Sequence, residues 1–144
     1  EELKRLGSEV SIVEGSDLDS ALARVRASRP DLTVCADEVP AGRPAPWMIY
    51  RNMEHLGIFP PSSVLKVGDT VPDIQAGINA GVRTVGITQT GSEVGLTQAD
   101  WEQLDEASQE AALTRASELF LKSGADAALA SIAELPAWLD EHTS

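Results

Sequence analysis

Residues 66–73 have the sequence Lys-Val-Gly-Asp-Thr-Val-Pro-Asp, in which Asp69 and Asp73 follow a short apolar run at residues 64–67. The run predicts a strand that ends at Gly68, so Asp69 lies at the strand's carboxyl end and Asp73 in the first turn of the next segment. In open α/β sheets, ligands bind at the carboxyl ends of the strands. Two carboxylates there suit a hard cation such as Mg²⁺, which proteins hold through one or two carboxylates together with phosphate and water.

The same residues also fit an ordinary turn that leads into a helix. In that interpretation Asp69 is the N-cap of the helix, and Asp73 is a solvated charge that favours the helix dipole. The spacing of the two aspartates leaves this alternative open beside metal binding.

Expected strands and helices alternate along the rest of the chain. The strands are predicted at residues 8–14, 31–35, 64–67, 82–87 and 127–130, and the helices at 18–27, 46–56, 72–80, 110–122 and 136–141. Thr97 and Asp100 resemble a capping pair for one further helical stretch. This alternation is typical of a Rossmann-like, doubly wound α/β fold with a mostly parallel sheet.

Composition limits the classes of protein to which the chain can belong. Its 144 residues correspond to about one domain, and its formal charge of −12 argues against nucleic acid or an anionic membrane as a partner, because both require a basic patch. No apolar run approaches the ~20 residues that span a bilayer. Cys35, the single cysteine, is expected to be a buried thiol, which fits a cytoplasmic protein. The first residue is Glu1, which leads us to expect a fragment.

A second notable stretch surrounds Arg43 with three prolines and a glycine, within residues 37–47. Because each proline fixes its own φ and restricts the residue before it, we expect Arg43 on a stiff loop that follows a strand. A planar guanidinium matches the oxygens of phosphate, although a solvated loop arginine is the alternative for this residue alone. Together with the acidic pair after the next strand, Arg43 predicts a site for one phosphate and its metal.

Four blocks of the sequence resemble the phosphonoacetaldehyde hydrolases (phosphonatases) of the haloacid dehalogenase superfamily. The blocks are Asp-Glu-Val-Pro-Ala-Gly-Arg-Pro-Ala-Pro-Trp-Met (37–48), Lys-Val-Gly-Asp-Thr-Val-Pro-Asp-Ile (66–74), Gly-Ile-Asn-Ala-Gly-Val-Arg-Thr-Val-Gly (77–86) and Gly-Ser-Glu-Val-Gly-Leu-Thr (91–97). The Gly-Asp-Thr block is shared by many phosphatases of the superfamily, whereas the first and last blocks point more narrowly to phosphonatases. The resemblance extends over residues 36–141.

The resemblance implies Mg²⁺-dependent hydrolysis of phosphonoacetaldehyde to acetaldehyde and phosphate. In that family a lysine of the cap domain forms a Schiff base with the aldehyde, and an aspartate near the amino terminus attacks phosphorus. The resemblance assigns to Arg43 the catalytic cation that binds phosphate, to Asp69 a metal-ligand role, and to Asp73 the support of the metal or its waters.

Parts of the family pattern are absent from the 144 residues. No Asp-x-Ala-Gly-Thr first motif is present, and the cap domain with its lysine is also missing. We therefore divide the chain into a βαβ-like segment that departs from the family (residues 1–35) and the carboxyl-terminal part of a haloacid dehalogenase-like core (36–144). Gly15 and Ser16 lie near the expected place of the superfamily's second motif and are our candidates for phosphate contacts.

These observations predict a P–C bond hydrolase that requires a complete enzyme, so that this chain alone is inactive. The alternatives are a phosphate-monoester phosphatase of the same superfamily and a non-catalytic remnant or dimerisation module. A small phosphorylated or phosphonate substrate is the expected partner, and a homodimer is kept open. Because parallel strands place their carboxyl ends on one side of the sheet, Arg43, Asp69, Asp73 and the Gly15–Ser16 pair are expected together there.

Overall fold

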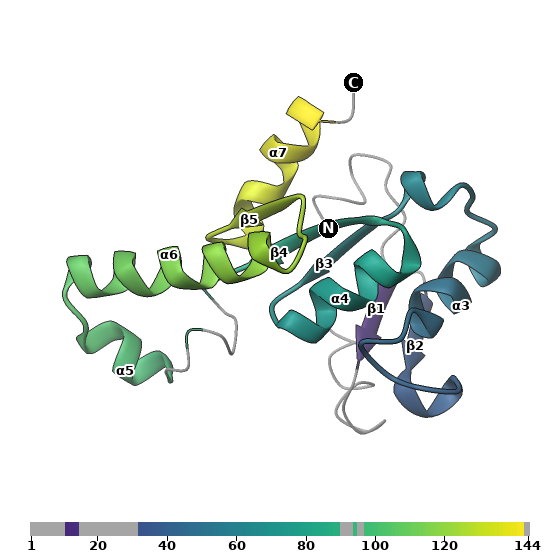
Figure 1. Ribbon diagram of the computed structural model, residues 1–144, viewed down its shortest axis with the longest axis horizontal. Helices are drawn as coiled ribbons and strands as arrows, with labels where there is room; N and C mark the ends of the chain where they lie inside the picture. Colours follow the sequence, from purple (N-terminus) through teal and green to yellow (C-terminus); the bar gives the residue numbers. More distant parts are fainter. Residues whose placement is uncertain (1–10, 15–31, 90–93, 95–96, 143–144) are drawn as a thin grey trace.

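The structure is a computed structural model that describes residues 11–14, 32–89, 94 and 97–142. Its described strands form two sheets in which every neighbouring pair is parallel (Figure 1). One sheet pairs β1 (Ser11–Glu14) with β2 (Leu32–Cys35), and the other has the order β3 (Leu65–Gly68), β4 (Arg83–Ile87) and β5 (Ala127–Leu129). The α/β fold with a parallel sheet is thus confirmed.

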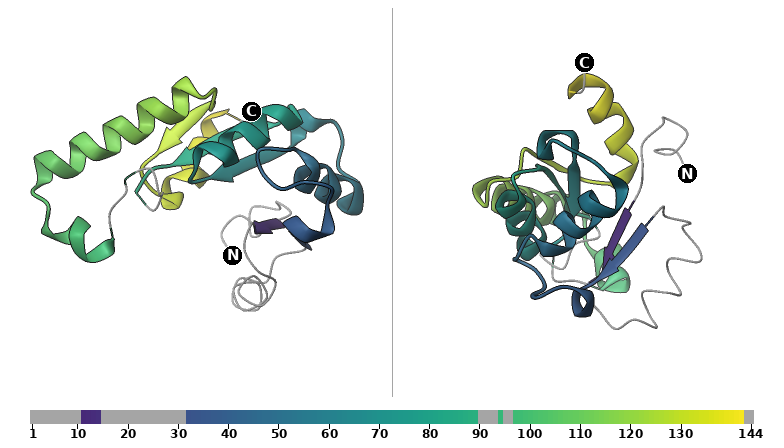
Figure 2. Two further views of the ribbon diagram at one scale, coloured as in Figure 1. Left: turned by 60° about the horizontal axis from the view of Figure 1, so that its bottom comes forward. Right: turned by 90° about the vertical axis from the view of Figure 1, so that its right-hand side faces the viewer.

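Five α-helices and three short 3₁₀ turns accompany the described strands. The helices are α3 (Trp47–Leu56), α4 (Val71–Ala80), α5 (Gln98–Gln103), α6 (Glu106–Lys122) and α7 (Leu135–His142), and the turns are η1 (Ala36–Glu38), η2 (Pro61–Ser63) and η4 (Ile132–Glu134). Figure 2 shows α5 and α6 as a hairpin that projects away from the β1–β2 pair. No described helix has both the length and the apolarity needed to cross a bilayer. The helix expected at 18–27 lies outside the described residues.

Helices cover both faces of the three-stranded sheet. On one face, Val85 and Ile87 of β4 cluster with Leu135 of α7. On the other face, the fully buried Phe120 of α6 packs against β4 at Gly86. This placement follows from the alternation of side chains along a strand, and it confirms the doubly wound arrangement around β4.

The boundaries of α6 differ from the sequence prediction. A helix was expected from residue 110, but the structure shows α5 ending at Gln103 and α6 beginning at Glu106. Asp105 is the N-cap of α6, and its carboxylate accepts a hydrogen bond from the backbone N–H of Ser108 at 2.7 Å. The predicted start was wrong because the first turns of α6 expose charged and small residues. They lack the regularly spaced apolar residues by which a helix is recognised in a sequence. The capping role of Thr97 is confirmed, since its hydroxyl accepts from the Asp100 N–H at 3.1 Å.

Candidate active site

The acidic stretch forms the junction between β3 and α4. Thr70 is the N-cap of α4: its hydroxyl accepts from the backbone N–H of Asp73 at 3.3 Å and donates to the Asp73 carboxylate at 2.7 Å. The alternative in which Asp69 caps this helix is therefore wrong. Asp69 instead lies just past the carboxyl end of β3, while Asp73 is buried in the first turn of α4.

Arg43 reaches this junction from the proline-rich loop that precedes α3. Its Nη1 donates to Oδ1 of Asp73 at 2.9 Å, and 29% of the Arg43 side chain remains exposed. The loop is fastened to α4, because the Asn79 side chain donates to the Pro44 carbonyl at 2.8 Å. The adjoining α3 is tied to the same residue, since the Tyr50 hydroxyl donates to the Asn79 carbonyl at 3.3 Å. The structure thus brings Arg43 and Asp73 into direct contact on a tethered loop.

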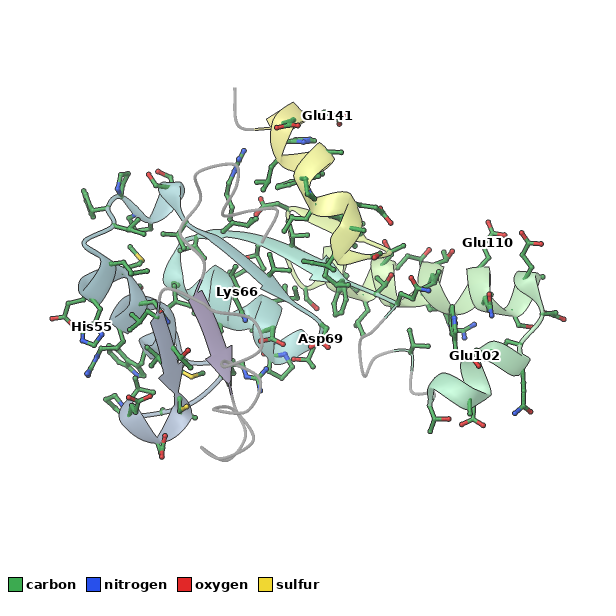
Figure 3. All side chains as sticks on the ribbon, turned by 180° about the vertical axis from the view of Figure 1, so that it is seen from behind. His55, Lys66, Asp69, Glu102, Glu110 and Glu141 are labelled. Carbon is green, nitrogen blue, oxygen red and sulfur yellow. The ribbon has the colours of Figure 1, made fainter. Side chains whose placement is uncertain are left out.

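Lys66 is a further charged residue of the cluster, and no role was predicted for it from the sequence. Its Nζ lies 2.9 Å from Oδ1 of Asp73, the same oxygen that Arg43 contacts. Figure 3 labels Lys66 on β3 and Asp69 beyond the end of the strand. Leu65 and Val67 pack with the cluster under α7. Since side chains alternate along a strand, one lysine between two apolar residues lies on the opposite face, and the structure places α4 over that face.

The two aspartates have opposite electrostatic environments. Burial raises the pKa of Asp69 above its ordinary value, and the neighbouring charge of Asp73 raises it further, against smaller opposing effects of Arg43 and Lys66. Burial would also raise the pKa of Asp73, but the charge of Lys66 and hydrogen bonds from Lys66, Thr70 and Arg43 lower it to about 2. Asp73 is therefore ionised and compensated, whereas the negative charge of Asp69 is disfavoured.

A divalent cation bound at Asp69 would stabilise the ionised carboxylate of this residue. Its charge would offset the burial and the repulsion that disfavour the Asp69 carboxylate, and carboxylate oxygen is the ligand type that Mg²⁺ takes. Asp73 is less suited to direct coordination, because Oδ1 already receives two cations and Oδ2 receives the Thr70 hydroxyl. Asp69 is thus the better candidate ligand, with Asp73 as its ionised neighbour.

The remaining predictions concern Gly15, Ser16 and Cys35. Gly15 and Ser16 lie outside the described residues, so their expected contact with phosphate stays a prediction. Cys35 is buried, as expected, with 2% of its surface exposed.

Cys35 belongs to a second group of potential metal ligands, since ligand atoms of Cys35, Asp37 and Glu38 lie within 4.8 Å of one another. Asp37 and Glu38 are exposed there, and the Glu38 carboxylate accepts from the Cys35 N–H at 2.6 Å.

Comparison with known proteins identifies the family. The family model of haloacid dehalogenase-like hydrolases matches residues 1–81, more than half of the chain. The chain belongs to the haloacid dehalogenase-like hydrolase family. Phosphonoacetaldehyde hydrolase from Hahella chejuensis is 43% identical to this chain over 121 residues, which are 84% of this chain and 41% of that protein. Phosphonoacetaldehyde hydrolase from Syntrophobacter fumaroxidans is 40% identical over 119 residues, 83% of this chain and 43% of that protein.

A solved structure gives the same assignment to the haloacid dehalogenase-like fold. The phosphonoacetaldehyde hydrolase-like protein from Oleispira antarctica superposes with a TM-score of 0.89 at 30% identity, covering 97% of this chain and 52% of that one. The resemblance to phosphonoacetaldehyde hydrolases is thereby confirmed. This chain spans about half or less of the length of these relatives. The domain boundary expected at residue 35 stays a prediction.

Proposed function

We propose that this haloacid dehalogenase-like chain carries the phosphate- and Mg²⁺-binding part of a hydrolase that cleaves the P–C bond of phosphonoacetaldehyde, yielding acetaldehyde and phosphate. The observation that carries the proposal is the pairing of Arg43, on its tethered loop, with Asp73 beside Asp69 at the end of β3. The relatives named phosphonoacetaldehyde hydrolase support the choice of substrate.

Each residue has a distinct role in this proposal. The partly exposed guanidinium of Arg43 donates hydrogen bonds to the oxygens of the phosphoryl group, for which its planar fork of donors is suited. Asp73 fixes the direction of that guanidinium through Oδ1, and Thr70 fixes Asp73 through Oδ2. Asp69 would hold Mg²⁺, which when bound supplies Lewis-acid stabilisation of charge on the phosphoryl oxygens.

The reaction also requires groups for which these 144 residues contain no recognisable motif. Transfer of the phosphoryl group from carbon needs a nucleophilic carboxylate, whose acyl phosphate is then hydrolysed, and the departing carbon needs an amine that withdraws electrons as a Schiff base. The chain's own contribution in this proposal is therefore binding and charge compensation.

Binding of inorganic phosphate tests this contribution. In the presence of Mg²⁺, we expect Arg43→Ala to weaken phosphate binding at least about tenfold, because a hydrogen bond to a charged group is lost. Arg51→Ala is the matched control, since Arg51 is partly exposed on α3 and its ion pair among the described residues is with Glu54 at 3.9 Å. Isothermal titration calorimetry measures both. Equal phosphate affinities for the two variants would place the phosphate site elsewhere.

An activity measurement tests the need for further groups. The chain alone, mixed with phosphonoacetaldehyde and Mg²⁺, is expected to release no acetaldehyde above the protein-free rate, because metal and arginine do not replace a nucleophile. The same result is expected for p-nitrophenyl phosphate, a phosphate monoester. Release of acetaldehyde that Arg43→Ala abolishes would show that the chain suffices. Release of nitrophenol without acetaldehyde would favour the monoester phosphatase.

A further inference from the structure

Lys66 and Arg43 converge on a single carboxylate oxygen. Both Nζ of Lys66 and Nη1 of Arg43 lie 2.9 Å from Oδ1 of Asp73. The other oxygen, Oδ2, receives the hydroxyl of Thr70 at 2.7 Å. The two cations therefore divide one acceptor between them. They are not equivalent, because 11% of the Lys66 side chain is exposed against 29% of that of Arg43.

Two glycines allow this convergence. A Cβ at Gly68 would collide with the Cβ of Asp73, so the absence of a side chain lets Asp73 lie directly over the end of β3. A Cβ at Gly77 would collide with Thr84 and lie 3.2 Å from the Cβ of Lys66. The close approach of α4 to β3 thus brings the aliphatic stem of Lys66 beneath the helix and its ammonium to Asp73.

We propose that Lys66 is a positioning residue for anion binding, which shares Asp73 with Arg43 and so keeps the Arg43 guanidinium available to a phosphoryl group. This inference rests on the proposed function. The largely covered side chain of Lys66 holds Asp73 in place and compensates its charge, so Arg43 does not have to do so alone. Arg43 contacts Asp73 through Nη1, and a guanidinium has further N–H donors that can turn to a ligand.

The charge of the cluster supports the same inference. At the shared oxygen, Lys66 and Arg43 contribute two positive charges against the one negative charge of Asp73. Without Lys66, Asp73 and Arg43 would form a simple neutral pair with little attraction for an anion. Asp73 would then draw its compensating charge from Arg43 alone among the residues that the structure describes.

Titration with inorganic phosphate in the presence of Mg²⁺ tests the role of Lys66. We expect Lys66→Met to weaken phosphate binding about tenfold, the effect of losing one charge-assisted interaction. Lys66→Arg should restore binding to within about threefold of the original chain, because it keeps the charge. Lys122→Met, at an exposed position in the last turn of α6, removes the same charge and should leave binding unchanged. Thermal unfolding of each variant establishes that it is folded, and Lys66→Gln replaces Lys66→Met if the latter does not fold.

NMR of the Arg43 side chain gives a readout that does not depend on phosphate. The Nη–H signals of Arg43, assigned by their loss in Arg43→Ala, should exchange more slowly with water in Lys66→Met, because Nη1 then has Oδ1 of Asp73 to itself. In an Asp73→Asn background, Lys66→Met should add little to either measurement. If the original chain binds no phosphate, the proposed function fails while the Arg43 signal still decides the role of Lys66. An unchanged Arg43 signal, or unchanged phosphate affinity in a folded Lys66→Met chain, would overturn the inference.

Discussion

Asp69→Asn is expected to abolish Mg²⁺ binding and, in the absence of metal, to make the folded chain more stable at pH 7. The reason is that the pKa of Asp69 is raised in the folded state above its ordinary value of 3.8, first by burial and then by the charge of Asp73. Ionised Asp69 therefore disfavours folding at pH values above the raised pKa, and this cost disappears as the pH falls below 3.8. The neutral amide removes the cost but also removes the charge that attracts the cation.

Two measurements separate these effects. Titration calorimetry with Mg²⁺ should show weak binding for the original chain, loss of binding for Asp69→Asn and reduced binding for Asp73→Asn. Urea unfolding at pH 7 and pH 3 should show a stability gain for Asp69→Asn that is confined to the higher pH. Asp37→Asn is the matched control, because Asp37 belongs to the second group of potential ligands near Cys35. Loss of Mg²⁺ binding in Asp37→Asn, with Asp69→Asn unaffected, would move the metal site to that group.

Asp73→Asn should destabilise the fold at pH 7 by about 2–3 kcal/mol. The substitution keeps the shape of the side chain but leaves Lys66 and Arg43 without their anion, and removing one partner of a buried ion pair is strongly unfavourable. We place the expected loss below that of a fully buried pair because the Arg43 side chain is 29% exposed and water can solvate it.

The loss caused by Asp73→Asn should depend on pH with a defined sign. The pKa of Asp73 is lowered from 3.8 to about 2 in the folded chain, so the ionised carboxylate stabilises the fold at pH values above 3.8. That contribution is lost as the pH falls through 2, and the difference between the original chain and the variant should shrink over this window. Asp140→Asn, at an exposed position on α7, should show neither the loss nor its pH dependence. A difference that is constant from pH 7 to pH 2 would mean that Asp73 acts only through packing.

Local sequence patterns were sufficient for the elements that carry the site. A short apolar run ending in Gly68 predicted β3, and Gly57 and Gly81 do end α3 and α4 in the left-handed conformation that favours glycine. The acidic pair after β3 was visible for the same reason, since residues directly after a parallel strand lie at its carboxyl end. Only the identity of the cap was misjudged, because Asp69 and Thr70 are adjacent and both residue types cap helices.

Neighbouring residues and short motifs were sufficient for the order of the described strands and helices, the family resemblance and the choice of Arg43, Asp69 and Asp73. The contact of both Arg43 and Lys66 with one oxygen of Asp73 was found in the tertiary structure and could not be read from those motifs. That geometry depends on contacts between residues far apart in the chain. The loop of Arg43 is held by Asn79, 35 positions beyond Pro44, and α4 approaches β3 closely where glycines leave room. Local periodicity indicates the face on which Lys66 lies but carries no information about such distances, so its contact with Asp73 became visible only in the tertiary structure.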